Sequence, residues 1–176
     1  LQTKINELHQ AQKALQESRE RYALIAQSAH DGLWDWNIRS NNIYYSPRWK
    51  SMLGYEEKEV GNTLAEWFDR IHAEDKAQFQ GKLSAHLAGL TNHFETEYRL
   101  LRQDGSYGWM LCRGLAVRDS EGKPYRMAGS QTDITQNKAA EAKLLHDAFH
   151  DGLTGLPNRL WFMEQLEKAI HQTKQD

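Results

Sequence analysis

The sequence predicts an α+β domain built on a five-stranded antiparallel sheet, with short helices on one face and longer helices flanking the domain. Two short runs of strand composition come first, and helical segments follow them. Three runs with period-two alternation come next, separated by turn residues such as Asp104-Gly105. This order is typical of a sheet made of hairpins that packs against helices inserted between its two groups of strands.

Residues 1–21 are predicted to form a helical linker before the domain. Small, apolar or aromatic side chains recur at alternating steps of three and four residues, as in a heptad seam. This seam consists of Leu1, Leu8, Ala11, Leu15, Ser18, Tyr22, Ile25 and Ala29, with Lys4 at one core position. We favour a parallel two-stranded coiled coil, and an amphipathic helix packed on its own domain is the alternative.

A strand pair is expected directly after this linker. Leu33–Ile38 is predicted to form the first strand, with Trp34 and Trp36 on the same face. Asn41-Asn42 supplies a turn, and Ile43–Tyr45 is predicted to form the second strand. The two strands therefore make a hairpin.

Helices are expected between this hairpin and the later strands. Ser46 followed by Pro47 is a capped start for a helix that ends at Gly54. A second short helix is expected over Thr63–Ile71, and a longer one over His72–Leu87 with acidic residues in its first turn. The remaining strands are expected at His93–Arg102, Tyr107–Arg118 and Tyr125–Thr132, and the last helix at Ile134–Phe149.

Composition and charge limit the functional classes. Hydrophobic residues make up 39% of the 176 residues and charged residues 26%, which is ordinary for a globular domain. The net charge is −2 and Lys and Arg form no block, so we expect no nucleic-acid partner. No apolar run of about 18 residues and no secretory signal is present, so we expect no membrane contact in this segment.

Cysteine usage indicates the compartment. Cys112 is the single cysteine, which excludes an internal disulfide and a zinc site with several thiolates. A reducing, cytoplasmic setting fits this usage. Since the chain begins with Leu1, upstream sequence could hold a membrane anchor of the parent protein.

Several short motifs resemble those of Trp-rich PAS domains in bacterial sensors. In chain order they are Trp34-Asp35-Trp36, Tyr45–Trp49, Leu53-Gly54-Tyr55, Ile71–Asp75, Glu97–Leu100, Asp104-Gly105-Ser106, Trp109 and Gly129–Thr135. They follow the order of that family, which usually has Pro where this chain has Ala73. The resemblance implies a PAS fold over residues 22–135, and the fold alone names no stimulus.

PAS domains hold small molecules between their helices and the inner face of the sheet, so inward residues are candidates for a ligand pocket. Period-two alternation predicts the inward set to be Trp34, Trp36, Tyr98, Leu100, Met110, Cys112, Gly114, Met127, Gly129 and Gln131. Gln131 is a polar amide on a core face and needs hydrogen-bond partners. Two interpretations stay open: a filled core in which Gln131 is bonded internally, and a pocket for a small ligand of unknown type.

The sequence leaves the cofactor unknown. Gln131 resembles the last-strand Gln of the flavin-binding LOV relatives, but their Asn-Cys-Arg-Phe-Leu helix motif is absent and Cys112 lies on a strand. We therefore expect no flavin adduct. Haem needs an axial His, for which His86 is a weak candidate, so haem is not expected. His146 and His150 lie four residues apart on a helix, but too few further ligands are near to predict a metal site.

The junction of Asp133, Ile134 and Thr135 is expected to relay signals. Asp133 is predicted to cap the following helix, with Gln136 completing a capping box, and Thr135 is a competing cap. The junction resembles the place in PAS proteins where a change in the sheet becomes a movement of the exit helix. An ordinary cap without a signalling role is the alternative.

The residues from Asp151 to Arg159 resemble Asp-x-Leu-Thr-Gly-Leu-x-Asn-Arg, the opening signature of GGDEF diguanylate cyclase domains. The resemblance implies a signalling helix over 136–150 and the truncated start of a GGDEF domain over 151–176. That family's metal-binding Asp and its Gly-Gly-Asp/Glu-Glu-Phe turn are absent, as are a Walker loop and a nucleophile elbow. We therefore expect no catalysis by this segment and a diguanylate cyclase as its parent.

The predicted function is that of a sensor and dimerisation module in a cyclic-di-GMP signalling protein. A homodimer is expected through the flanking helices, with Leu144, Leu145 and Ala148 in the exit seam. One alternative is a ligand-free scaffold for dimerisation or protein interaction. Another is the sensor of a protein with a degenerate GGDEF domain and a further phosphodiesterase domain.

Overall fold

The computed structural model describes residues 12–13 and 31–173. The chain forms two compact units, Leu1–Asp133 and Ile134–Asp176, and each is described by itself. Gln12 and Lys13 are helical, while the rest of the predicted N-terminal helix and coiled-coil linker lies outside the described residues. None of the helices in the described ranges is long and apolar enough to cross a membrane.

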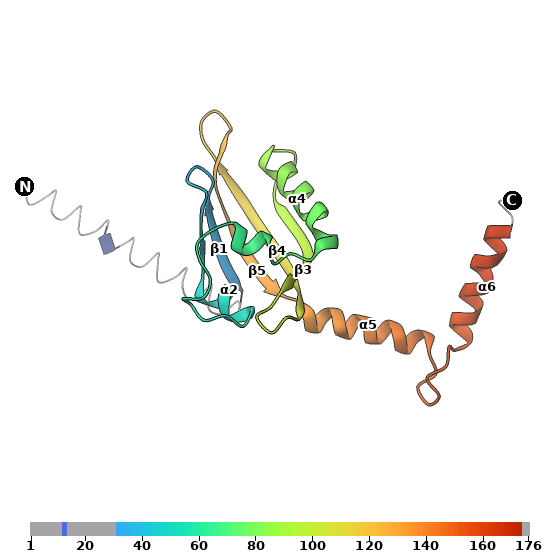
Figure 1. Ribbon diagram of the computed structural model, residues 1–176. Helices are drawn as coiled ribbons and strands as arrows, with labels where there is room; N and C mark the ends of the chain where they lie inside the picture. Colours follow the sequence, from blue (N-terminus) through green and yellow to red (C-terminus); the bar gives the residue numbers. More distant parts are fainter. Residues whose placement is uncertain (1–11, 14–30, 174–176) are drawn as a thin grey trace, which may run out of the picture. The chain divides into compact units, whose positions relative to one another are not determined.

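The first unit is built on one five-stranded antiparallel sheet (Figure 1), as predicted. In chain order the strands are β1 (Gly32–Asn37), β2 (Asn42–Tyr45), β3 (Phe94–Leu101), β4 (Tyr107–Arg118) and β5 (Pro124–Asp133). Their spatial order is β2-β1-β5-β4-β3. The first strand therefore pairs with the last, and the strand that leads out of the unit lies at the centre of the sheet.

Three helices between β2 and β3 pack on one face of this sheet (Figure 1), namely α2 (Pro47–Met52), α3 (Ala65–Phe68) and α4 (Ala73–Leu87). The predicted start of α2 is confirmed, because Ser46 Oγ accepts a hydrogen bond from the Trp49 amide at 3.2 Å. Gly54 follows α2 with a φ of 87°, a backbone conformation that favours glycine. The local signals for this helix are therefore sufficient to place both its ends.

The second helix is shorter than the predicted Thr63–Ile71, because its flanking residues cover the two edges of the sheet. The amide of Ile43 in β2 donates to the Asn62 carbonyl at 3.0 Å. At the other edge Ile71 bridges to β3, where the Leu101 amide donates to the Arg70 carbonyl at 2.9 Å. Covered edges leave fewer unpaired backbone groups for association with another chain.

The core lies between the helices and the inner face of the sheet. Phe94, Thr96, Tyr98 and Leu100 alternate as buried residues along β3, which confirms the predicted inner face. The Trp34 side chain of β1 lies over the neighbouring strands β5 and β4. A Cβ atom on Gly114 would be 2.6 Å from Trp34 Cη2, and one on Gly129 would be 2.6 Å from Trp34 Cζ2. Glycine at both positions lets the indole approach the backbones of β4 and β5.

The second unit contains α5 (Thr135–Phe149) and α6 (Arg159–Thr173), joined by residues 150–158. The predicted helix Ile134–Phe149 is thus confirmed apart from its first residue. None of the residues of α5 is buried. This helix presents its side chains to solvent in the single chain.

We predict that Gly129→Ala lowers the free energy of unfolding by about 3 kcal/mol or more, because the new methyl group meets the Arg113 carbonyl and the Trp34 ring. Gly81→Ala is the matched control, since a Cβ there contacts nothing within 4 Å and the site lies inside α4. The control should stabilise the chain by up to about 1 kcal/mol. Urea denaturation of both variants tests this, and equal effects would contradict the packing of Trp34 described above.

Candidate functional site

The structure brings the predicted pocket residues together on the inner face of the sheet. The buried members are Trp34, Tyr98, Leu100, Met110, Cys112, Met127 and Gln131, and Trp36 packs against them while partly exposed. The space between this face and the helices is filled. The cavity left there measures about 10 Å³ and is lined by Trp34, Trp36, Leu64, Trp67, Phe68, Phe79, Leu83, Phe94 and Met127. A volume of this size is close to the least that holds one water molecule.

Aromatic side chains from the helices fill the space, and sequence reasoning did not single them out. The Trp67 ring lies 4.9 Å from Trp34 and 5.6 Å from Phe79 between ring centroids, in tilted or edge-on arrangements. Phe79 in turn lies 4.8 Å from Tyr98. Such geometries are the favourable ones for aromatic pairs and add about 0.5–1.5 kcal/mol each beyond area burial. The run Ala65-Glu66-Trp67-Phe68 in α3 was the signal that could have found Trp67.

A chain of hydrogen bonds runs through this aromatic core. Trp67 Nε1–H donates to the Tyr98 hydroxyl at 2.8 Å, and that hydroxyl donates to Gln131 Oε1 at 2.5 Å. Burial raises the pKa of the Tyr98 phenol well above its ordinary value, so the group stays neutral and keeps its proton to donate. The chain links the helical layer to β3 and to the exit strand β5. Gln131 Nε2 is buried without a hydrogen-bond partner among the described residues.

The side chains considered as cofactor or metal ligands are Cys112 on the inner face of the sheet and four histidines outside the set of predicted pocket residues. Cys112 is buried beside Gln131 in the neighbouring strand, and burial raises the pKa of its thiol. His72 caps the start of α4, and both ring nitrogens of His86 are within hydrogen-bond distance of protein atoms. His146 and His150 stack with ring centroids 4.0 Å apart. Over residues 12–13 and 31–173, no three His, Cys, Asp or Glu side chains gather in a group that could hold a metal ion.

The predicted cap at the end of β5 is corrected by the structure. Ile134 occupies the N-cap position of α5 and makes no side-chain cap hydrogen bond, while Asp133 lies within β5. The Asp133 carboxylate instead accepts from the Arg102 guanidinium at 2.5 Å. Arg102 also packs over Gly108 of β4, where a Cβ atom would meet its guanidinium at 2.7 Å. The ion pair therefore spans the ends of β3, β4 and β5 at the point where the chain leaves the sheet.

A second junction joins α5 to α6 within the second unit. Asn158 donates from its backbone amide to the Phe149 carbonyl at 2.8 Å and from Nδ2 to the Ala148 carbonyl at 2.7 Å. Its Oδ1 accepts from the Trp161 amide at 3.1 Å. Asp151 Oδ1 accepts from both the amide and the hydroxyl of Thr154, at 2.9 and 2.8 Å. The polar residues of this motif thus hold the turn between two helices.

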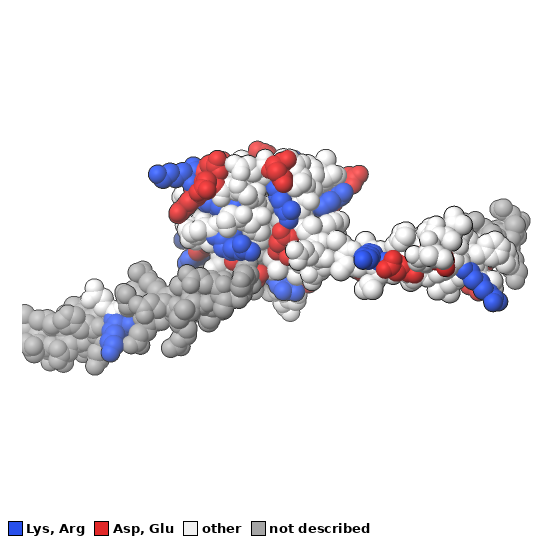
Figure 2. All heavy atoms as spheres, turned by 90° about the horizontal axis from the view of Figure 1, so that it is seen from below, with Lys and Arg blue, Asp and Glu red and all other residues white. Residues whose placement is uncertain are grey.

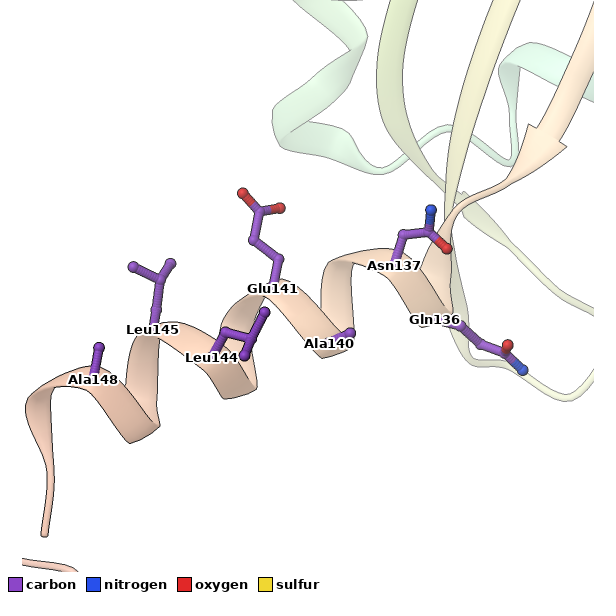
Figure 3. A pocket seen from close by; sticks show the side chains of 7 residues that line it. All are labelled: Gln136, Asn137, Ala140, Glu141, Leu144, Leu145 and Ala148. Carbon is purple, nitrogen blue, oxygen red and sulfur yellow. The ribbon is translucent and has the colours of Figure 1, made fainter. Parts of the chain in front are cut away.

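An exposed apolar strip follows one side of α5. Leu144 is 72% exposed and Leu145 is 56% exposed. Figure 3 shows these leucines with Ala140 and Ala148 along the helix, in a shallow hollow that Gln136, Asn137 and Glu141 also line. Adjacent exposed apolar side chains of this kind mark a candidate interaction surface.

Charge on the first unit is mixed. Figure 2 shows Lys and Arg side chains interspersed with Asp and Glu on the face in view. Within this unit, ion pairs join neighbouring strands, as in Arg113 with Glu95 at 2.7 Å and Arg126 with Asp35. No continuous basic area stands out among the described residues on this face.

The sequence and the fold of this chain are similar to those of known PAS domains. The family model described as PAS fold matches residues 42–131. A solved structure of a sensory box histidine kinase/response regulator from Burkholderia thailandensis is 36% identical, with a TM-score of 0.63 over 70% of this chain and 92% of that one. The N-terminal domain of a diguanylate cyclase with PAS/PAC sensor from Marinobacter aquaeolei is 24% identical, with a TM-score of 0.55 over 61% of this chain and 98% of that one.

Longer relatives share this segment. An uncharacterised protein, y4lL of Sinorhizobium fredii, is 29% identical over 89% of this chain, and the probable diguanylate cyclase DgcE of Escherichia coli is 25% identical over 81%. The chain spans 19% of the first relative's length and 13% of the second's.

The five-stranded antiparallel sheet with helices on one face, together with the match to the PAS fold, defines a sensor domain of the kind found in signalling proteins. With the family match covering about half of the chain, the chain belongs to the PAS family.

We predict that Tyr98→Phe lowers the free energy of unfolding by about 1–3 kcal/mol, because it leaves Trp67 Nε1 and Gln131 Oε1 buried without their partner. Tyr107→Phe is the control, since the Tyr107 side chain is exposed at the surface and should change stability by less than about 0.5 kcal/mol. Chemical denaturation followed by tryptophan fluorescence measures both. A neutral Tyr98→Phe would show that the hydroxyl does not organise the core.

Proposed function

We propose that the chain is the regulatory sensor of a cyclic-di-GMP signalling protein, a diguanylate cyclase whose GGDEF domain begins at Asp151. In this proposal the state of the PAS core reaches the cyclase through α5. The observation that carries the proposal is the junction around Asn158, because it joins the exit helix to the first helix of the next domain by direct hydrogen bonds.

The sequence of this junction supports the assignment of the output domain. Asp151–Arg159 resembles the opening signature of GGDEF domains, and its Asp, Thr and Asn residues each make a local hydrogen bond in the turn. Gly155 has a φ of 68°, which explains glycine at that position of the motif. The similarity to the E. coli probable diguanylate cyclase and to the Marinobacter diguanylate cyclase sensor points to the same output.

The proposed partner of α5 is a second copy of the same helix. Ala140, Leu144 and Ala148 recur at four-residue steps with Leu145 beside them, which makes one apolar strip. None of the residues of α5 is buried in the single chain, so this strip is available for association. Because a diguanylate cyclase joins two GTP molecules held by opposed domains, the phase of a parallel α5 pair would set whether the two active sites meet.

The proposed relay begins at the end of the central strand. Arg102 and Asp133 tie the end of β3 to the last residue of β5, one residue before the cap of α5. A change in the core that shifts β5 must therefore act on this ion pair before it reaches α5. Gln131 lies two residues before Asp133 and is bound to Tyr98, which gives the core a direct contact with the same strand.

A second candidate function is a dimerisation scaffold that binds no ligand. The observation that favours it is the cavity of about 10 Å³, since a ligand among the predicted pocket residues would have to displace a buried aromatic side chain. Native mass spectrometry and absorbance of the purified chain distinguish the two candidates. A stoichiometric bound molecule supports ligand sensing, and an empty domain supports the scaffold.

We predict that one Ala inserted after Lys143 changes the rate at which the full-length protein converts GTP to cyclic-di-GMP, because it rotates the following residues by about 100° about the helix axis. Insertion of seven residues, about two turns, should restore the original phase and the original rate. One Ala inserted in the exposed turn at Gly122 is the control and should leave the rate unchanged. A rate that is the same throughout the insertion series would contradict the proposal.

We predict that Arg102→Gln increases hydrogen exchange of the amides from Gln131 to Asp133, because the carboxylate at the end of β5 loses its ion pair with the Arg102 guanidinium. The pair is partly exposed, so the free energy of unfolding should fall by less than about 1 kcal/mol. Arg113→Gln removes a comparable pair with Glu95 on the exposed face and should leave these amides unchanged. Equal exchange in the two variants would argue against a relay through Arg102.

A further inference from the structure

Strand β4, the longest of the sheet, extends beyond its neighbour β3, and His86 accepts a backbone hydrogen bond from the part of β4 that β3 does not reach. The pairing of β3 with β4 ends at Phe94 opposite Gly114, while β4 continues to Arg118. Past Gly114 the edge of β4 that faces β3 has no strand partner, and backbone amides away from water need an acceptor. The Ala116 amide donates to His86 Nε2 at 3.1 Å. The His86 ring therefore supplies the hydrogen-bond acceptor that β3 does not provide at this point of β4.

This geometry allows one protonation state of the ring. Nε2 accepts a hydrogen bond from a backbone amide and so carries no proton, which leaves Nδ1 as the protonated nitrogen of a neutral ring. Nδ1 lies 3.1 Å from the Thr91 carbonyl oxygen and 3.0 Å from the Thr91 hydroxyl oxygen, and both oxygens can accept its hydrogen bond. The ring is the neutral tautomer with its proton on Nδ1. At 2% exposure, His86 is shielded from water that could replace either partner.

The surroundings of the ring disfavour a positive charge. Burial is the largest cause that lowers the pKa of His86 below its ordinary value. The hydrogen bond to the Thr91 carbonyl acts in the opposite direction and raises the pKa, while electrostatic interaction with Arg118 in β4 and with His93 in the segment before β3 lowers it further. Arg118 also donates to the carbonyls of His86 and Leu87 at 2.7 and 3.1 Å. Among the groups that act on the ring, none is a carboxylate that would stabilise the imidazolium.

We propose that His86 is a proton-operated latch: its neutral ring holds the C-terminal end of α4 to β4, and protonation releases that end. A proton on Nε2 would place two N–H donors, those of His86 and Ala116, against each other without an acceptor. It would also bring an imidazolium next to the Arg118 guanidinium.

Release of the latch would act on the aromatic core. Leu83 and Leu87, on the same part of α4, pack against the core, and Leu83 lines its small cavity beside Phe94 and Met127. Ala116 pairs with Met127 of β5, the strand that leads to Asp133. Protonation of His86 would therefore loosen the packing of α4 on the core. It would also loosen the end of the β4–β5 hairpin that lies far from Asp133. This inference concerns the first unit alone and does not depend on the identity of the output domain.

The direction of the pH dependence follows from the lowered pKa. The folded chain binds the proton less readily than the unfolded chain, whose His has the ordinary value of 6.5. The contribution of His86 to stability is therefore full above pH 6.5 and decreases as the pH falls from there toward the folded-state pKa. The imidazole is the side chain suited to a change in this range.

Hydrogen exchange and NMR of the whole chain test the latch. Between about pH 7.5 and about pH 5, after correction for intrinsic rates, the protection of the Ala116 amide should be lost while that of Met110, inside the paired part of β4, is retained. In His86→Gln, whose amide can accept and donate but does not titrate in this range, Ala116 should keep the same protection at both pH values. His146→Gln removes an exposed His of the second unit and should behave as the parent chain.

Two results would overturn the proposal. One is loss of Ala116 protection in His86→Gln that matches the parent chain, and the other is protection in the parent chain that does not change with pH. If His86→Gln does not fold, the ¹⁵N shifts of the His86 ring in the parent chain decide the matter. They should report the Nδ1–H tautomer at neutral pH and titrate together with the Ala116 amide, and a ring that titrates without moving that amide also rejects the latch.

Discussion

The first unit depends on the contact of Trp34 with two glycines on neighbouring strands. The indole lies against Gly114 and Gly129, where no side chain would fit, and this position requires β1 to pair with β5 in the observed register. The indole also contacts Trp67 of α3, so the helices pack against the same ring. The cavity beside these two rings measures about 10 Å³. A ligand that enters this space must therefore displace one or more of the side chains that line it.

The parts of the fold that local chemistry determines could be predicted from the sequence. Period-two alternation placed the inner face of β3 correctly, and a Ser-Pro pair located the start of α2. These features depend on residues within one element, so spacing alone reveals them. The fold class follows from the order of such elements, and the family match confirms it.

The errors came where a distant partner competes with a local one. Asp133 has the right spacing for a capping box, but Arg102 binds its carboxylate from 31 positions earlier in the chain. The second short helix is shorter at both ends than predicted, because Thr63 pairs with Asn42 of β2 and Ile71 with Leu100 of β3. The aromatic pair at the end of Ala65–Phe68 indicates that this helix covers the core, but the spacing of a four-residue helix does not show that Trp67 is the side chain that fills it. Whether a ligand pocket is open depends on how side chains from different elements pack together, and spacing along the sequence does not show this.

The two junctions differ in how they could transmit a change. Arg102 and Asp133 form one partly exposed ion pair, which constrains the strand ends weakly. Asn158 is different, because its amide and its side chain serve the carbonyls that α5 leaves unpaired at its end and an amide that α6 leaves unpaired at its start. A rotation of the last turn of α5 cannot leave these bonds intact unless the first turn of α6 follows. In the proposed relay, the tighter of the two joints therefore lies after α5, and the weaker one lies before it, at the end of β5.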